Sequence, residues 1–209
     1  MKTKPLTFLL ALTFLFLFSG SVFGDDLQDG FDAYKRNDYK EAFKLFRLSA
    51  VQGNESAQFN LGLMYYEGQG VPQDDNEAFR LFRLAADQGF AGAQNNLGVM
   101  YSKGQGVPQD YKEAVKWYRL SAEQGDAGAQ SNLGLMYYKG RGVLQDYSLA
   151  HMWWNICGSN GNKDCVKTRN IVEKRMSPSQ KEKAQELARN WKPTTNHTTL
   201  TTRNFTSLH

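Results

Sequence analysis

The sequence predicts an all-α fold, an α/α superhelical solenoid of helix-loop-helix repeats closed by a C-terminal capping helix. First, NLGLMYYEGQGVPQDD (60–75), NLGVMYSKGQGVPQDY (96–111) and NLGLMYYKGRGVLQDY (132–147) follow one another at steps of 36 residues. Second, apolar residues inside each repeat recur at helical spacing. Third, two glycines interrupt that spacing at the same place each time, and Pro follows them in the first two copies. Such a period is typical of stacked units that bury their apolar faces against one another.

The chain begins with an expected export segment. Two lysines precede the apolar run LTFLLALTFLFLF, and Val22 and Gly24 are small residues in front of a cut before Asp25. Residues 1–24 are therefore predicted to be a secretory signal peptide, too short for a comfortable membrane span, with an uncleaved anchor as the alternative. The mature protein is expected to be periplasmic or secreted, without a membrane span.

The rest of the chain divides into an array and a tail. The predicted solenoid covers 25–192, with units of about 26–53, 57–89, 93–125 and 129–161 and a cap of 162–192. Residues 193–209 are Thr-rich and lack periodicity, so we expect a disordered tail there. Removal of residues 1–24 takes away two Lys and no acid, so the formal net charge falls from +4 to +2. That weak balance argues against a nucleic-acid partner.

The first half of each repeat is predicted to be a helix. In residues 91–125, Ala93, Leu97, Met100 and Tyr101 stand at i, i+4, i+7 and i+8, which places them on one helical face. Gly98 lies on the same side and is expected to let a neighbouring backbone approach.

The loop and the second helix follow from local signals. Gly104 and Gly106 end the first helix, and Pro108 prevents its continuation. Asp110 and Glu113 then form a predicted capping box. The same pair recurs as Asp38 with Glu41 and Asp74 with Glu77, and is absent where Leu149 follows Asp146. The second helix is expected to bury Ala114, Trp117, Tyr118 and Ser121 and to end at Gly125.

The glycine-rich loops have two possible interpretations. Such a loop beside a helix can cradle a phosphate, or it can connect two helices. The loop occurs three times, and no Lys-Ser or Lys-Thr follows it as a phosphate-binding loop requires. We therefore interpret the loops as joints, and predict no cofactor.

The C-terminal segment resembles a cap. Ser177 is the expected N-cap, with Pro178 as the first helical residue and Gln180 closing a capping box. An apolar stripe follows on one face, made of Ala184, Leu187, Ala188 and Trp191. One apolar face and one polar face are what a terminal helix of an array requires.

Two cysteines, Cys157 and Cys165, occur in the chain. Cys157 occupies the position of Ser49, Ala85 and Ser121, and Cys165 that of Ala57, Ala93 and Ala129. Small residues at both positions indicate two closely packed helices, so we predict a disulfide, with two buried free thiols as the alternative. Two Cys without an adjacent His do not make a zinc site, and no metal is expected.

The pattern A-x-x-x-L-G-x-x-Y-x-x-G-x-G-V-x-x-D-x-x-x-A on a 36-residue step resembles the Sel-one-like repeat family, relatives of the tetratricopeptide repeats. The match is strong over 57–161 and partial over 31–53. The resemblance implies a right-handed superhelix that acts as an adaptor or scaffold for other proteins. The Cys pair also resembles a secreted cysteine-rich branch, some of which binds or hydrolyses β-lactams, so such an enzyme is the alternative function.

The residues themselves do not predict an active site. The chain lacks S-x-x-K, S-D-N and K-T-G, as well as H-E-x-x-H and G-x-S-x-G. His151 occupies the position of Phe43, Phe79 and Val115, so we expect a partly packed or surface side chain. We therefore predict a binding protein and no catalytic residue.

Partner binding is predicted on the concave face, which the first helices of the units line. Core positions repeat, whereas this face varies from unit to unit, as expected for a surface that reads a non-repeating partner; an unconstrained wet surface is the alternative. The candidate residues are Phe59, Asn60, Tyr66, Asn95, Asn96, Ser102, Lys103, Ser131, Asn132, Tyr138 and Lys139. Asn60, Asn96 and Asn132 form a predicted ladder for an extended peptide or for bonds between repeats.

The second helices carry basic pairs, Lys44 with Arg47, Arg80 with Arg83 and Lys116 with Arg119. Glu41, Glu77 and Glu113 precede the first member of each pair by three residues. Because each helix neutralises itself in part, a solvated surface is favoured over a site for an acidic partner or anionic lipid.

Overall fold

A computed structural model describes residues 26–194, and every regular element within that range is an α-helix, which confirms the predicted all-α class. The expectations for residues 1–24 and for the tail from residue 195 onward lie outside the described residues. The chain forms two compact units, one ending at Gln88 and the other beginning at Gly89.

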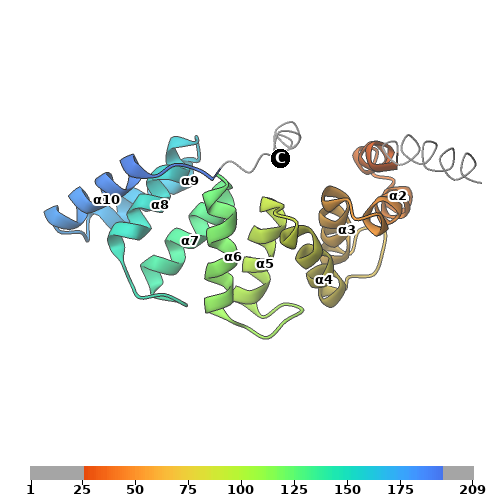
Figure 1. Ribbon diagram of the computed structural model, residues 1–209, viewed down its shortest axis with the longest axis horizontal. Coiled ribbons are helices and arrows are strands. Elements are labelled where there is room, and N and C mark those ends of the chain that lie inside the picture. Colours follow the sequence, from red (N-terminus) through yellow and green to blue (C-terminus); the bar gives the residue numbers. More distant parts are fainter. Residues whose placement is uncertain (1–25, 195–209) are drawn as a thin grey trace, which may run out of the picture. The chain divides into compact units, whose positions relative to one another are not determined.

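The first unit contains a helix over residues 26–35 and then α2 (Tyr39–Val51), α3 (Glu55–Glu67) and α4 (Asp75–Asp87). The second contains α5 (Ala91–Lys103), α6 (Tyr111–Glu123), α7 (Ala127–Lys139), α8 (Tyr147–Ser159), α9 (Lys163–Glu173) and α10 (Pro178–Asn190) (Figure 1). Within each unit, successive helices from α2 to α4 and from α5 to α9 pack on one another, and α10 packs on α8.

The close approach at Gly98 is made by a side chain. A Cβ atom at Gly98 would lie 2.5 Å from Cδ1 of Tyr118, a buried ring on α6. The same arrangement recurs in the pairs Gly62–Phe82 and Gly134–Trp154. Because that distance is far below van der Waals contact, only glycine leaves room for the ring. The expectation of a neighbouring backbone at Gly98 was wrong, because residue spacing does not show which group fills the gap.

Each glycine-rich loop connects the first and second helix of one repeat. Gly104 ends α5 with φ +70°, and its amide donates to the carbonyl of Met100 at 2.8 Å. In the loop after α3, Gly70 has φ +72°, and a Cβ atom there would lie 2.5 Å from the carbonyl oxygen of Tyr39 at the start of α2. The preceding repeat therefore fills the inner side of this bend. This contact supports the interpretation of the loop as a connection between helices and not as a phosphate-binding loop.

The predicted capping boxes form only in part. The Asp110 carboxylate accepts from the amides of Lys112 and Glu113 at 2.8 and 3.1 Å, as an N-cap does. The amide of Asp110 donates to the Tyr101 carbonyl at 2.9 Å, and the Glu113 carboxylate pairs with Lys116 instead. Asp74 and Asp38 likewise donate their amides to main-chain carbonyls. A carbonyl of the preceding helix therefore accepts the amide proton that a reciprocal Glu side chain would have accepted. The complete box forms at Ser177 and Gln180.

A buried glutamine links the repeats in each unit. Nε2 of Gln58 donates to the Ala50 carbonyl at 3.3 Å, and Nε2 of Gln88 donates to Oε1 of Gln58 at 2.8 Å. The equivalent bonds in the second unit are Gln130 to Ala122 at 3.1 Å and Gln124 to Gln94 at 2.7 Å. Residues 58, 94 and 130 are Gln in three successive repeats, and this repetition was the sequence signal for the link.

The last repeat lacks one of these bonds. Residue 160, which corresponds to Gln88 and Gln124, is Asn160. Oε1 of Gln130 is buried without a hydrogen-bond partner in the described part of the chain. The Asn160 side chain is one methylene shorter than that of glutamine. Oε1 of Gln130 therefore lacks the hydrogen bond that Gln88 and Gln124 donate in the earlier repeats.

Helices α8 and α9 are joined covalently. The Sγ atoms of Cys157 and Cys165 are 2.03 Å apart and the Cα atoms 5.9 Å apart, which supports the predicted disulfide. Both residues are buried.

The cap helix α10 is seated on α8. The rings of Trp191 and Trp153 meet at 6.0 Å, and Ala184 is buried in the core of the second unit. Beyond α10, the amide of Thr194 donates to the Glu123 carbonyl at the end of α6 at 2.7 Å. Residues 193 and 194, at the start of the segment assigned to the tail, lie within the described residues.

Candidate binding surface

The eleven candidate partner residues all lie on the first helices of the repeats. Phe59, Asn60 and Tyr66 are on α3; Asn95, Asn96, Ser102 and Lys103 are on α5; Ser131, Asn132, Tyr138 and Lys139 are on α7. The two lysines are exposed and the other nine side chains are half-buried. The α3 residues belong to the first unit and the others to the second.

On α3 the face is aromatic. The rings of Phe59 and Tyr66 lie 5.8 and 6.4 Å from the ring of Phe82, which is itself buried. Phe82 thus supports both half-buried rings from below. Large, rigid side chains held in this way are suited to binding because little conformational entropy remains to be lost.

On α7, Tyr138 is held by its neighbours. Its ring lies 5.6 Å from Tyr147 and 5.9 Å from Trp154. The guanidinium of Arg175, from the segment after α9, lies 5.8 Å from the ring centroid and donates to the hydroxyl. Tyr138 is thereby held between two aromatic rings of α8 and the guanidinium of Arg175.

The predicted asparagine ladder is replaced by a diagonal contact. Nδ2 of Asn132 donates to Oδ1 of Asn95 at 3.1 Å, whereas Nδ2 of Asn60 donates to Ser56 within its own helix at 2.7 Å. Helices α5 and α7 contact each other directly, so the pair joins adjacent repeats. A bond between repeats was one of the two expectations, although Asn95 makes it in place of Asn96. Each amide has more donors and acceptors than one bond uses.

One carboxyl group lies beside this pair. Asp126 caps α7 by accepting from the Ala129 amide at 2.7 Å. A Cβ atom on Gly128 would meet both Oδ1 of Asp126 and Nδ2 of Asn95, at 3.2 and 3.3 Å. Burial raises the pKa of Asp126, and hydrogen bonds from the Ala129 and Gly128 amides oppose that change.

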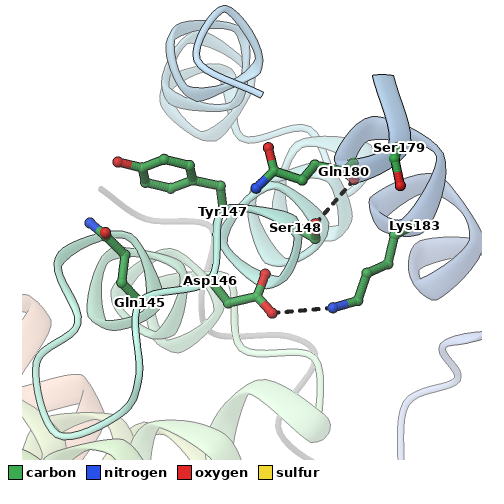
Figure 2. A pocket seen from close by; sticks show the side chains of 7 residues that line it. All are labelled: Gln145, Asp146, Tyr147, Ser148, Ser179, Gln180 and Lys183. Carbon is green, nitrogen blue, oxygen red and sulfur yellow. Dashed lines mark hydrogen bonds and ion pairs between the residues drawn. The ribbon is translucent and has the colours of Figure 1, made fainter. Parts of the chain in front are cut away.

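A pocket of about 340 Å³ lies between the first turns of α8 and α10 (Figure 2). Its lining residues are Gln145, Asp146, Tyr147, Ser148, Ser179, Gln180 and Lys183. Asp146 accepts from the Leu149 amide at 3.0 Å and pairs with Lys183 at 3.3 Å. The Ser148 hydroxyl donates to the Gln180 carbonyl at 3.1 Å. The Asp146–Lys183 and Ser148–Gln180 contacts therefore join the start of α8 to α10.

His151 is more deeply buried than expected, with 6% exposed. Its Nε2 lies 3.9 Å from Oε2 of Glu173, and its Nδ1 has no hydrogen-bond partner among the described residues. Burial lowers the pKa of His151, and the Glu173 carboxylate partly opposes this shift. The equivalent residue of the preceding repeat, Val115, is also buried, so this position belongs to the packed side of the second helix.

The basic residues of the second helices pair within their own helices. Arg80 pairs with Glu77 at 2.6 Å and Lys44 with Glu41 at 3.3 Å, and Lys116 pairs with Glu113. These pairs confirm the predicted partial neutralisation. Nη2 of Arg119 donates to the Tyr137 hydroxyl at 2.8 Å.

Among residues 26–194 no helix is both long and apolar enough to cross a membrane, and no three His, Cys, Asp or Glu side chains gather as metal ligands would. These findings concern only that range, and the export prediction depends on residues outside it.

Comparison with known proteins identifies the repeats. Residues 27–54, 55–90, 91–126 and 127–162 each match the Sel1 repeat. The sequence matches no protein among those of curated function.

The similar solved structures include the following two. One is a protective antigen present in uropathogenic Escherichia coli strains, displaying an SLR fold; it is 38% identical with a TM-score of 0.69 over 72% of this chain. The other is a Sel1 repeat protein from Oxalobacter formigenes, 34% identical with a TM-score of 0.66 over 69% of this chain. The match spans 32% of the first and 60% of the second protein. Four matched repeats, covering more than half of the sequence, show that the chain belongs to the Sel1 repeat family, whose members are typically non-catalytic protein-interaction scaffolds.

Proposed function

We propose that the protein is an exported scaffold that binds a protein or peptide on the face formed by the first helices of its repeats. The observation that carries the proposal is the contrast between conserved packing and varied surface inside one chain. The core position is Leu61, Leu97 and Leu133 in successive repeats, whereas the surface position two residues earlier is Phe59, Asn95 and Ser131. A surface that served only solubility would not need buried residues beneath it to hold its rings in place.

The chemistry of the face indicates an extended or helical polypeptide partner. The rings at Phe59 and Tyr66 offer apolar contact on α3, and the amides of Asn95 and Asn132 can bond a main chain on α5 and α7. Lys103 and Lys139 add two exposed cations at the ends of α5 and α7. The first unit thus offers aromatic anchors and the second unit polar contacts, and protein interfaces use both kinds of group.

Photo-crosslinking in the exporting cell tests the proposal. A photoreactive amino acid at Ser102 or Ser131 should give a discrete covalent adduct, identified by mass spectrometry, and the same group at exposed Gln185 on α10 should not. The variant Asn132→Ala/Tyr138→Ala should abolish the adduct from Ser102 while keeping its helical circular dichroism. Equal labelling from all three positions would contradict a specific face.

Export is tested separately by the mass of the mature protein. Cleavage before Asp25 predicts a chain that starts at that residue in the periplasmic or culture fraction. A chain retaining residues 1–24 in the cytoplasm would contradict export but leave the binding face intact.

The alternative, a β-lactam-binding or hydrolysing enzyme, gains no support from any particular group in residues 26–194. We expect the pure protein to leave the chromogenic cephalosporin nitrocefin intact. Turnover that disappears in Ser148→Ala or Lys183→Ala would establish the alternative.

A further inference from the structure

The outer face of α6 carries an open groove that the proposed function does not use. It has a volume of about 450 Å³ and is lined by Lys112, Val115, Lys116, Arg119, Leu120 and Gly142. The five α6 residues follow helical spacing and share one face. Val115 is buried at its base, whereas Leu120, a large apolar side chain, is 45% exposed.

The equivalent face of α8 is covered by two helices of this same chain, α9 beside His151 and Asn155 and α10 beside Ser148. The matching residues, one repeat later, are Ser148, His151, Met152, Asn155 and Ile156. Ile156, which corresponds to exposed Leu120, is only 5% exposed, and Ser148 is only 2% exposed. Helix α10 packs on α8, and its Gln180 carbonyl accepts the bond from Ser148. This face of the repeat is therefore shaped to receive an amphipathic helix.

The basic residues of α6 determine which side chains a helix that packs on this face must have. Where α8 has serine, methionine and asparagine, α6 has Lys112, Lys116 and Arg119. The ion pair of Lys116 with Glu113 offsets one of these three cations. A helix that covers the face must therefore supply carboxylates, because cations buried without partners are costly. We propose that the outer face of α6 binds an acidic amphipathic helix of another protein.

The groove also limits the size of the occupant. From Lys112 to Leu120 the face extends eight residues, or roughly 12 Å at the helical rise. The segment after α10 contacts the C-terminal end of α6, where the amide of Thr194 donates a hydrogen bond to the Glu123 carbonyl. The occupant therefore makes contact over two to three turns, with an apolar stripe on Val115 and Leu120 and carboxylates beside the three cations.

A peptide copied from α10 is the sharpest probe. It carries the sequence of residues 177–194 with its apolar stripe intact and with Gln180, Lys181 and Lys183 replaced by Glu. Fluorescence anisotropy of the labelled peptide measures its affinity for the full mature chain. The matched control peptide has Glu182 and Glu186 replaced by Lys and keeps the original residues elsewhere.

The acidic peptide is expected to bind, with affinity falling as salt is added, and the basic control is expected to bind at least tenfold more weakly. Lys112→Glu/Lys116→Glu changes only exposed side chains and should weaken binding at least tenfold. Leu120→Glu should do the same. The variant Lys103→Glu/Lys139→Glu changes the face of the proposed function and should leave peptide binding unchanged, so the two proposals can fail separately.

Several outcomes would overturn the inference. Absence of binding, equal binding of both peptides, or binding unaffected by the α6 variants would each do so. If sedimentation shows a dimer that Leu120→Glu dissociates, the occupant is a second copy. If the peptide binds only after removal of residues 195–209, the occupant is the chain's own end.

Discussion

Helices α6 and α8 occupy the same place in successive repeats, but their outer faces meet different surroundings. On α6, Lys112, Lys116 and Leu120 are exposed, and the helix balances part of its charge through Glu113. On α8 the corresponding residues are Ser148, Met152 and Ile156, and all three are buried.

The difference in side chains between α6 and α8 follows from the packing of α10 on α8. The apolar face of α10 must be buried against apolar side chains. The outer face of α8 therefore lacks the charged residues that are exposed to solvent on α6. The identity of these side chains thus indicates which second helix of the array is terminal. The same comparison shows that the outer face of a repeat can receive a helix.

The largest effect should come from removing the covalent link of α8. The variant Cys157→Ala/Cys165→Ala installs the residues found at Ala85 and Ala93 in other repeats. Loss of the short loop should lower the free energy of unfolding by about 2–3 kcal/mol in the chain-entropy model. Urea denaturation followed by circular dichroism measures it, with wild type under reducing conditions as the comparison. An unchanged midpoint would show that packing by α10 alone holds this end.

The second test concerns the two glycines against which the buried rings of α6 and α8 pack. Gly98→Ala beneath Tyr118 and Gly134→Ala beneath Trp154 should each cost about 1–3 kcal/mol, because both rings are buried. Trp154 cannot shift freely, since its Nε1 donates to the Ser131 carbonyl at 3.1 Å. A double-mutant cycle with Tyr118→Ala is the control, because the cost of Gly98→Ala should vanish once the ring is gone.

The third test restores to the end of α8 a bond that α6 already has. Asn160→Gln should place an amide donor near Oε1 of Gln130, as Gln124 does for Gln94. Satisfying this buried acceptor should add about 0.5–1.5 kcal/mol. The reverse change, Gln124→Asn, should cost a similar amount. A neutral result in both variants would mean that water serves these acceptors equally well.

The smallest effect concerns pH. Burial lowers the folded-state pKa of His151, opposed by Glu173 on α9 and reinforced by Arg169 on α9 and Lys181 on α10. The folded state therefore binds fewer protons than the unfolded state, so the free energy of unfolding should decline as pH falls below about 6.5, the unfolded-state pKa. His151→Phe, which installs the residue of the first two repeats, should remove this component. Melting temperatures from pH 8 to pH 5 measure the difference, and parallel profiles would contradict it.

Much of the fold followed from the sequence because its signals are local and occur repeatedly. Spacing of apolar residues placed the helices, and glycine with proline placed the loops. The small residues at the positions of Cys157 and Cys165 indicated their proximity. The eleven candidate binding residues were placed on first helices correctly, although their role remains a proposal.

Other features depended on which distant groups meet. The sequence contained Gly98 and Tyr118 but did not show that the ring covers the glycine. Likewise it contained Asp110 and Glu113, but the Tyr101 carbonyl in the last turn of α5 accepts the Asp110 amide. The sequence by itself determined a helical repeat array with glycine joints, because those signals act within one repeat. Only the tertiary structure decided that α10 folds onto α8 and leaves the face of α6 open, because packing between segments far apart in the chain depends on the shape of both surfaces.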